Sequence, residues 1–217
     1  MKYLLASLTL TALIVSCANA PQADKVTLRN EQTASTITGN VYSLDTTSSR
    51  VTWTGTKPTG QHLGTFKLDS GVISLEKNQL KGGSFIININ SLTNLDLQGE
   101  DKTKLEGHLK SADFFDSNKY PLAKFEITSV TPFDSSQVKS VLPNSNVLIS
   151  GNLTLKNTTK NVTFPAVVTI SNAFVAAKAN FNIDRTQWGL SYGNDQSLRD
   201  NFIRPEVNIQ LELKAKK

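Results

Sequence analysis

Leu105–Phe125, which reads L-E-G-H-L-K-S-A-D-F-F-D-S-N-K-Y-P-L-A-K-F, is the stretch around which the rest of the chain is organised. The flanking segments alternate apolar and polar residues, the period of a β-strand, whereas this stretch does not alternate. Leu105 and Leu109 lie four residues apart, with His108 beside them, so one turn of helix places them on one face. We therefore predict a short helical plug between two halves of a β-protein.

The second half of this stretch carries two adjacent aromatic side chains. Ser111 can cap a second short turn that holds Phe114 and Phe115. Pro121 then favours an extended backbone for the residue before it, which leads the chain into a new strand. The plug is thus expected to present two phenylalanines to the β-protein around it.

Short alternating runs on both sides of the plug predict β-strands. The expected strands cover residues 49–57, 63–70, 71–76, 80–90, 124–131, 147–155, 162–171, 174–183 and 207–214. Short turns join most of these runs, which favours antiparallel neighbours in either a sandwich or an up-and-down barrel. Closing the sheet into a barrel would remove its exposed edges.

Alternation also groups side chains by face. Phe85, Ile87 and Ile89 share one face of their strand, and the Gly82-Gly83 pair before them predicts a β-bulge. In the last strand, one face carries Val207, Ile209, Leu211 and Leu213. The pattern shows which residues share a face, but not which face is inside.

Residues 1–16 have the layout of an export signal. Lys2 is the only charge, and the apolar run after it is short for a membrane-spanning helix. The sequence A-N-A at residues 18–20 suits ordinary signal peptidase, but Pro21 would follow that cut, where its fixed φ and missing N–H are unfavourable. The sequence I-V-S-C at residues 14–17 instead resembles the lipobox of bacterial lipoproteins.

Cys17 is the only cysteine, so neither an intramolecular disulfide nor a cysteine-based metal site can form. We predict that Cys17 is lipidated and anchors an exported protein, periplasmic or at the cell surface, to a bacterial membrane. Residues 17–40, rich in Thr, Asn, Gln and Ala, are expected to form a flexible tether. Residues 41–217 are enough for one folded domain with its own core.

The residues for common catalytic and metal sites are sparse. His62, expected in a turn, and His108, in the plug, are the only histidines, and no H-x-H or H-E-x-x-H spacing occurs. A Ser–His–Asp triad assembles in space and therefore stays open. Asp184-Arg185 is expected to be a salt bridge that fixes a loop. We predict no enzyme activity, no metal and no cofactor.

Charge argues against a nucleic-acid partner. The net charge is +5, charged residues make up 19% of the chain, and the basic residues are spread along it rather than gathered with aromatics. The aromatic residues are distributed over nearly every expected element, so they either fill a core or line a cavity. Burying apolar ligand surface contributes about 25 cal/mol per Å², so a cavity could hold a hydrocarbon chain without a charged anchor.

Four ordered motifs resemble the YceI-like polyisoprenoid-binding proteins. The first is H-L-K-S-A-D-F-F-D at residues 108–116, followed by Tyr120-Pro121 and Phe125. The others are W-T-G-T-K at residues 53–57 with G-T-F at 64–66, G-N-L-T-L at 151–155 with Thr159 and Val162, and I-D-R-T-Q-W-G at 183–189. The resemblance runs from about residue 42 to residue 214, and a lipobox departs from the many family members that are simply secreted.

The resemblance implies an all-β fold, an antiparallel eight-stranded lipocalin-like barrel with a short helical insertion and a tunnel for a long isoprenoid or similar amphiphile. Combined with strand alternation, it gives a set of candidate ligand-binding residues: Trp53, Phe85, His108, Phe114, Phe115, Phe125, Phe181, Arg185 and Trp188. Of these, His108 and Arg185 are expected either to orient a polar head group or to hold the plug. Quinone, prenyl phosphate and fatty amide ligands all stay open.

The function expected from this is a carrier that sequesters or transports an isoprenoid or related lipid and is held at a membrane by its N-terminal anchor. The alternative is a surface or stress-response lipoprotein whose barrel is filled by its own side chains and which acts through a protein partner. A lipid-modifying enzyme is the third hypothesis. A homodimer is compatible with the sequence.

Overall fold

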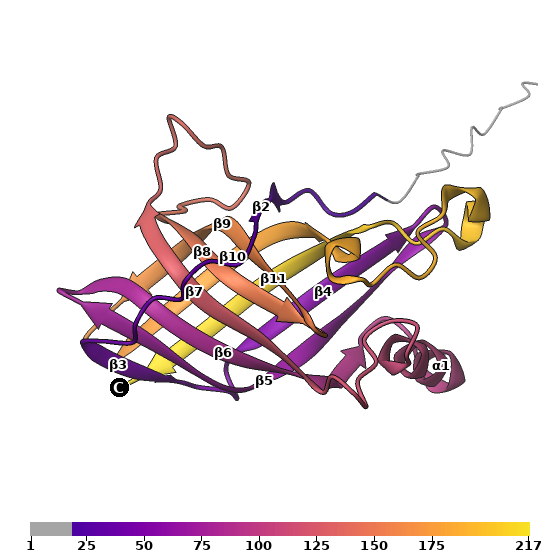
Figure 1. The fold of residues 1–217 in the computed structure, drawn as a ribbon, viewed down its shortest axis with the longest axis horizontal. Coiled ribbons are helices and arrows are strands. Elements are labelled where there is room, and N and C mark those ends of the chain that lie inside the picture. The colour runs from indigo at the N-terminus through magenta and orange to yellow at the C-terminus, as the bar shows by residue number, and fades with distance from the viewer. Residues whose placement is uncertain (1–18) are drawn as a thin grey trace, which may run out of the picture.

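Eight antiparallel strands close into a barrel in the computed structural model, which describes residues 19–217 (Figure 1). Each strand pairs with the next along the chain, and the last pairs with the first, so the barrel is of the up-and-down type. The strands are β4 (Arg50–Lys57), β5 (Gly60–Glu76), β6 (Gln79–Asn94), β7 (Leu122–Pro132), β8 (Val147–Leu155), β9 (Thr158–Ile170), β10 (Phe174–Asp184) and β11 (Glu206–Lys216). The predicted all-β fold, an eight-stranded antiparallel barrel with a helical insertion, is confirmed.

A short strand that the sequence pattern did not predict lies between β5 and β11, beside the end of β4. β3 (Asn40–Leu44) pairs with β5 and β11 where β4 does not reach. The link between β3 and β4 is fixed by Asp45, whose carboxylate accepts hydrogen bonds from Thr47 and Ser48. β3 and β4 together therefore fill the gap between β5 and β11.

The two strands expected at residues 63–70 and 71–76 form one continuous strand, β5. Its register against β6 shifts between Leu68 and Ser70, so the backbone is irregular there without ending the strand. A second shift lies where Ser74 pairs with Gly82 and Leu75 pairs with Leu80, beside the predicted Gly82-Gly83 bulge. Bulges of this kind let long strands bend around a closed barrel.

The insertion consists of α1 (Gly99–Lys110) and the turn that follows it. The helix begins six residues before Leu105, the first residue of the expected plug. Its first turn carries Glu100 and Asp101, which suit a helix N-terminus but give no apolar period to detect. At the other end, the Ser111 hydroxyl donates to His108 O and accepts from Asp113 N, which forms the predicted turn before Phe114.

The N-terminal segment first fills the barrel wall where β9 and β10 separate, and then crosses the outer face of β8 and β7 (Figure 1). β1 (Asp24–Lys25) pairs with β10, β2 (Thr27–Arg29) pairs with β9, and Ser35 N donates to Ile127 O of β7. Residues 21–40, called the strap below, are thus bound to the barrel, in the part of the chain where the sequence predicted a flexible tether over residues 17–40. Asparagine side chains of the barrel bind the strap backbone, which explains why so polar a segment is held in place. Both the predicted signal peptide and Cys17 lie outside the described residues.

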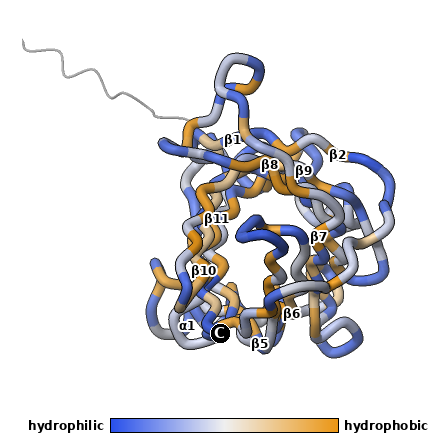
Figure 2. The backbone as a smooth tube through the Cα atoms, turned by 90° about the vertical axis from the view of Figure 1, so that its left-hand side faces the viewer, coloured by the Kyte–Doolittle hydropathy of each residue, from blue (hydrophilic) through white to orange (hydrophobic). Residues whose placement is uncertain are grey.

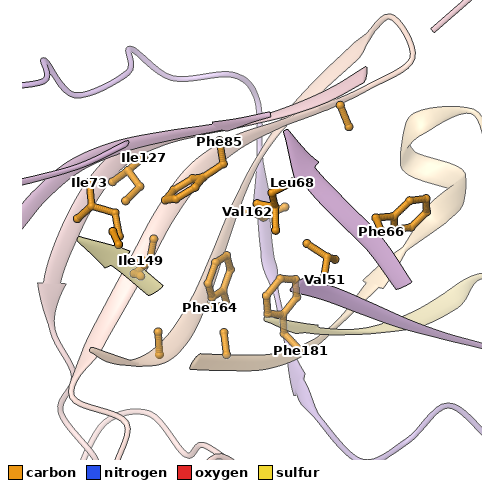
Figure 3. Packing of buried hydrophobic residues seen from close by; sticks show 14 of the residues in the cluster. Val51, Phe66, Leu68, Ile73, Phe85, Ile127, Ile149, Val162, Phe164 and Phe181 are labelled. Atoms are coloured by element: carbon orange, nitrogen blue, oxygen red, sulfur yellow. The ribbon is translucent and has the colours of Figure 1, made fainter. Parts of the chain in front are cut away.

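Inward-facing apolar side chains from all eight barrel strands form the interior, which Figure 2 views from the end that carries the C-terminus. Figure 3 shows part of it, with Phe164 beside Phe181 and Phe85 across from them. The shared faces inferred from alternation, such as Val207, Ile209, Leu211 and Leu213 of β11, turn inward. No helix within residues 19–217 is long and apolar enough to cross a membrane.

Candidate ligand cavity

A cavity of about 320 Å³ lies inside the barrel, at the end that carries α1 and the loop between β10 and β11. Every barrel strand contributes at least one side chain to its wall, and almost all are aliphatic or aromatic. Such a size and lining are typical of small-molecule sites. Several inward-facing residues, among them Ile87, Leu153 and Leu211, are only half-buried although they lie on the inner face of the sheet.

The mouth of the cavity is built by the helical plug and by the loop between β10 and β11. Three rings meet there: His108 lies 4.5 Å from Tyr192 and 5.3 Å from Phe114, and Phe114 lies 5.5 Å from Tyr192, as ring centroid distances. Lys156, in the β8–β9 turn, donates from Nζ to the carbonyl of Phe114 at 3.1 Å. Phe115 packs edge-on against Phe66 of β5, with centroids 5.5 Å apart, so the plug is joined to both sides of the barrel.

Arg185 holds the loop that forms the other side of the mouth. Its buried guanidinium donates to the carbonyl oxygens of Leu190, Ile203 (2.8 Å) and Arg204 (3.3 Å). It also lies over the ring of Phe114, 5.5 Å from the centroid. Burial lowers the pKa of Arg185, while the charge of Asp184 opposes that shift. With three of its donors used by the loop, Arg185 fits the plug-holding role better than head-group binding.

The expected Asp184–Arg185 salt bridge is replaced by two separate interactions. Asp184 caps the 3₁₀ turn η1 (Arg185–Trp188) by accepting from Thr186 N at 2.9 Å and from Thr186 Oγ1 at 2.6 Å. Arg185 turns the other way, toward the loop carbonyls. The prediction that this pair fixes a loop holds, but each residue does so through its own hydrogen bonds.

His62 lies at the mouth as well, within β5 rather than in the expected turn. Its Nδ1 is 2.7 Å from Asp96 Oδ2, and the other carboxylate oxygen accepts from Leu63 N and from Asn94 Nδ2, each at 2.7 Å. Burial alone would raise the pKa of Asp96, but the hydrogen bonds from His62, Leu63 and Asn94 outweigh it and lower the pKa. This network ties the end of β6 to β5 beside the cavity.

The structure brings eight of the nine candidate residues to the cavity wall. These are Trp53, Phe85, His108, Phe114, Phe115, Phe125, Phe181 and Arg185. Trp188 does not line the cavity: its side chain is buried, and its Nε1 donates to Leu153 O at 2.9 Å. Trp53 Nε1, by contrast, is buried without a hydrogen-bond partner in the described part of the chain.

Aliphatic residues make up much of the wall and were not named as candidates from the sequence. Ile87, Ile89 and Leu92 come from β6, and β11 supplies four more. Alternation gave the signal for Ile87 and Ile89, which share the face of Phe85, and for the four residues of β11. It gave none for Leu92, which is out of phase with Phe85 because the β5–β6 register shifts between Asn88 and Thr93. Within residues 19–217, no three His, Cys, Asp or Glu side chains gather closely enough to hold a metal ion.

An antiparallel eight-stranded barrel with an apolar interior cavity and a plug at one end is a lipocalin-like barrel. The chain belongs to the YceI-like family, because the model of the YceI-like domain matches residues 42–215. Protein YceI of Shigella flexneri is 34% identical over 112 residues, which are 49% of this chain and 51% of that protein. The chain thus matches about half the length of this curated relative.

Two solved structures share the fold. BcnA of Burkholderia cenocepacia has a TM-score of 0.63 at 20% identity, covering 80% of this chain and 99% of BcnA. A polyisoprenoid-binding domain from Saccharophagus degradans, implicated in plant cell wall breakdown, has a TM-score of 0.56 at 20% identity, covering 81% of this chain and 97% of that domain. At this identity the likeness concerns the barrel, while the family assignment comes from the domain match.

Proposed function

We propose that this protein binds a long-chain isoprenoid or a related amphiphilic lipid in the barrel cavity and carries or sequesters it without chemical conversion. The observation that supports this most is the lining of the cavity, which is apolar from the partly exposed mouth to the ring of Phe164. Each methylene group transferred from water into such an environment contributes about 0.8 kcal/mol. A long hydrocarbon chain therefore needs no charged partner inside the barrel.

The name of the Saccharophagus degradans domain, which says that it binds polyisoprenoids, adds to this proposal. The polar groups sit where a head group would lie. Lys57, His62 and His108 border the cavity at the mouth, and each is partly exposed. Because Arg185 is occupied by loop carbonyls, these three side chains are the better candidates to face a polar head group.

The cavity also bears on the alternative of a filled barrel that works through a protein partner. A barrel filled by its own side chains would leave no continuous open space next to inward-facing residues, whereas here about 320 Å³ remain open. Interior packing of folded proteins rarely leaves such a space unless it has a use. The carrier hypothesis is favoured on this ground.

The first experiment is native mass spectrometry of the mature chain with Cys17→Ser, followed by organic extraction. A stoichiometric extra mass that is released as an isoprenoid or fatty compound supports the carrier and identifies the ligand class. A protein that is free of ligand, and stays so after incubation with ubiquinone, menaquinone and prenyl phosphates, would contradict it. Turnover of a bound lipid, lost in a folded His108→Ala variant, would revive the enzyme hypothesis.

We also propose that Cys17 carries the lipid anchor and that the protein is exported to a bacterial periplasm or cell surface. The lipobox-like sequence I-V-S-C at residues 14–17 supports this. The test is mass spectrometry of the N-terminal peptide from cells, together with membrane fractionation. An acylated Cys17 and loss of membrane association in Cys17→Ala are expected, while cleavage after residue 20 would refute the anchor. Sedimentation of the same sample tests the homodimer.

A further inference from the structure

A second, smaller cavity of about 40 Å³ lies beyond the first, toward the end of the barrel that carries β3. The two cavities share five lining residues: Phe85, Phe125, Phe164, Leu211 and Leu213. A residue that borders both cavities stands between them. The interior is therefore one long space that a layer of side chains divides into two parts.

Three rings that border both cavities form this layer, and Phe181, which borders only the first cavity, stacks on one of them. We call the four rings the phenylalanine partition: Phe85 of β6, Phe125 of β7, Phe164 of β9 and Phe181 of β10. Neighbouring centroids lie 6.4 Å apart for Phe85–Phe125, 5.9 Å for Phe125–Phe164 and 4.2 Å for the stacked pair Phe164–Phe181. Figure 3 shows three of them, with Phe164 and Phe181 side by side. Leu211 and Leu213 of β11 complete the layer on the remaining side.

Glycines on the adjacent strands make room for two of these rings. A Cβ added to Gly151 of β8 would overlap the ring of Phe125, and one added to Gly71 of β5 would come within 2.6 Å of the ring of Phe85. These rings lie against bare backbone, so their positions are set by the wall and not only by one another. The partition is thus a built feature of the barrel.

The walls behind the partition are lined partly by small side chains. Ala166, Ala177 and Ala179 border the second cavity together with isoleucines and Leu80. Phe164 is the central member of the layer, since it contacts both Phe125 and Phe181 and borders both cavities. Removing its ring would join the two spaces.

We propose that the phenylalanine partition is the end-stop that sets how long a lipid chain this barrel accepts. The proposal rests on lipid binding as proposed above and adds a chain-length limit to it. A ligand enters at the mouth, its chain extends along the apolar wall, and its far end meets the rings of the partition. A chain that is too long to end at this layer must leave part of its length outside the mouth. That part stays in contact with water and adds less to the free energy of binding.

The test is competition between prenyl quinones of graded side-chain length, read out by native mass spectrometry on the Cys17→Ser chain and its Phe164→Ala variant. We expect the wild-type sequence to prefer one length and Phe164→Ala to shift that preference toward longer chains by on the order of tenfold in relative affinity. Phe164→Leu, which keeps most of the packing, should shift it in the same direction by less. Circular dichroism checks that both variants are folded.

Phe115→Ala is the matched control, because Phe115 lines the first cavity at the mouth and does not border the second. It should change overall affinity without changing the preferred length. In the Phe164→Ala background, Ala177→Leu refills the second cavity and should restore the preference for shorter chains.

An unchanged length preference in both folded Phe164 variants overturns the end-stop. If neither Phe164 variant folds, the single variant Ala177→Leu is measured instead. An end-stop in front of the second cavity predicts that filling this cavity leaves the preferred chain length unchanged. A shift of the preference to shorter chains overturns the proposal. Absence of binding by the parent Cys17→Ser chain to every quinone, fatty amide and prenyl phosphate contradicts the proposed function itself.

Discussion

The ring of Phe125, on β7, lies across the backbone of Gly151, on the neighbouring strand β8, and occupies the space that any larger residue would need. A Cβ added to Gly151 would also come within 2.9 Å of the carbonyl oxygen of Glu126. The contact therefore involves both an aromatic ring that borders the cavity and a rigid part of the sheet. Neither can move far without changing the shape of the barrel interior.

Replacing Gly151 by alanine should push the Phe125 ring into the cavity or bend β8 away from β7. Overpacking of this kind lowers the free energy of unfolding by about 1–3 kcal/mol. Urea unfolding followed by circular dichroism measures the loss. Gly107→Ala is the control, because no atom lies within 4 Å of a Cβ added there and alanine favours the helix by roughly 1 kcal/mol. Equal stability of the two variants would contradict the contact.

Arg185→Lys should destabilise the loop between β10 and β11 although the charge is kept. A lysine cannot reach three carbonyl oxygens at once, and each buried acceptor left without a donor costs about 1–3 kcal/mol. We expect a lower melting temperature, by roughly 2–4 °C for each kcal/mol lost in a chain of this size. Thermal unfolding by calorimetry is the measurement.

Arg50→Lys provides the comparison for that experiment. Arg50 pairs with Glu212 on the exposed outer face of the barrel, and exposed ion pairs contribute about 0–1 kcal/mol. Its melting temperature should stay close to that of the wild type. If Arg185→Lys lowers the melting temperature no more than Arg50→Lys does, the loop carbonyls must find other hydrogen-bond donors and the predicted role of Arg185 is contradicted.

Asn152→Ala should release part of the strap. The Asn152 side chain accepts from Gln32 N at 3.1 Å and from Asn161 Nδ2 at 3.0 Å, and it donates to Gln32 O at 2.6 Å. Loss of this bridge should cost about 1–3 kcal/mol and speed hydrogen exchange of strap amides. Gln32→Ala is the matched variant, since it removes a side chain but keeps both backbone bonds. Faster exchange in both variants to the same extent would argue against the Asn152 bridge.

Acid should loosen the mouth through Asp96. Its pKa is lowered in the folded state because hydrogen bonds from His62, Leu63 and Asn94 outweigh the effect of burial. A group with a lowered folded pKa contributes stability above its unfolded pKa of about 4 and loses it as the pH falls through the folded value. Protection of the Leu63 amide against exchange should therefore drop below about pH 4, and Asp96→Asn should flatten this pH dependence.

The barrel could be predicted in large part from the sequence because alternation reports local geometry. Faces such as that of Phe85, Ile87 and Ile89 were grouped correctly, and the family resemblance supplied which face lines the interior. Alternation failed at β5, where a register shift interrupts the pattern while the strand continues. It also gave no sign of the first half of α1, whose exposed charged residues carry no apolar period.

The strap and Trp188 could not be predicted from local pattern. The strap is held by side chains about 120 residues away, such as Asn152, and such pairings leave no trace in the composition of a Thr- and Asn-rich segment. Trp188 was grouped with the cavity because of its motif, yet its indole N–H is used by Leu153 O on the barrel wall. In both cases a polar bond between distant segments decides the position.

The strap changes how far the barrel can stand from a membrane. Its first fixed point is Pro21, whose carbonyl accepts from Asn182 Nδ2 at 3.1 Å, two residues before β10 ends at the mouth. With Cys17 as the proposed anchor, only four residue steps separate the acyl chains from this point, a reach of at most about 14 Å. The mouth is then kept close to the bilayer surface, so that a lipid would pass between membrane and barrel over a short distance instead of through open solvent.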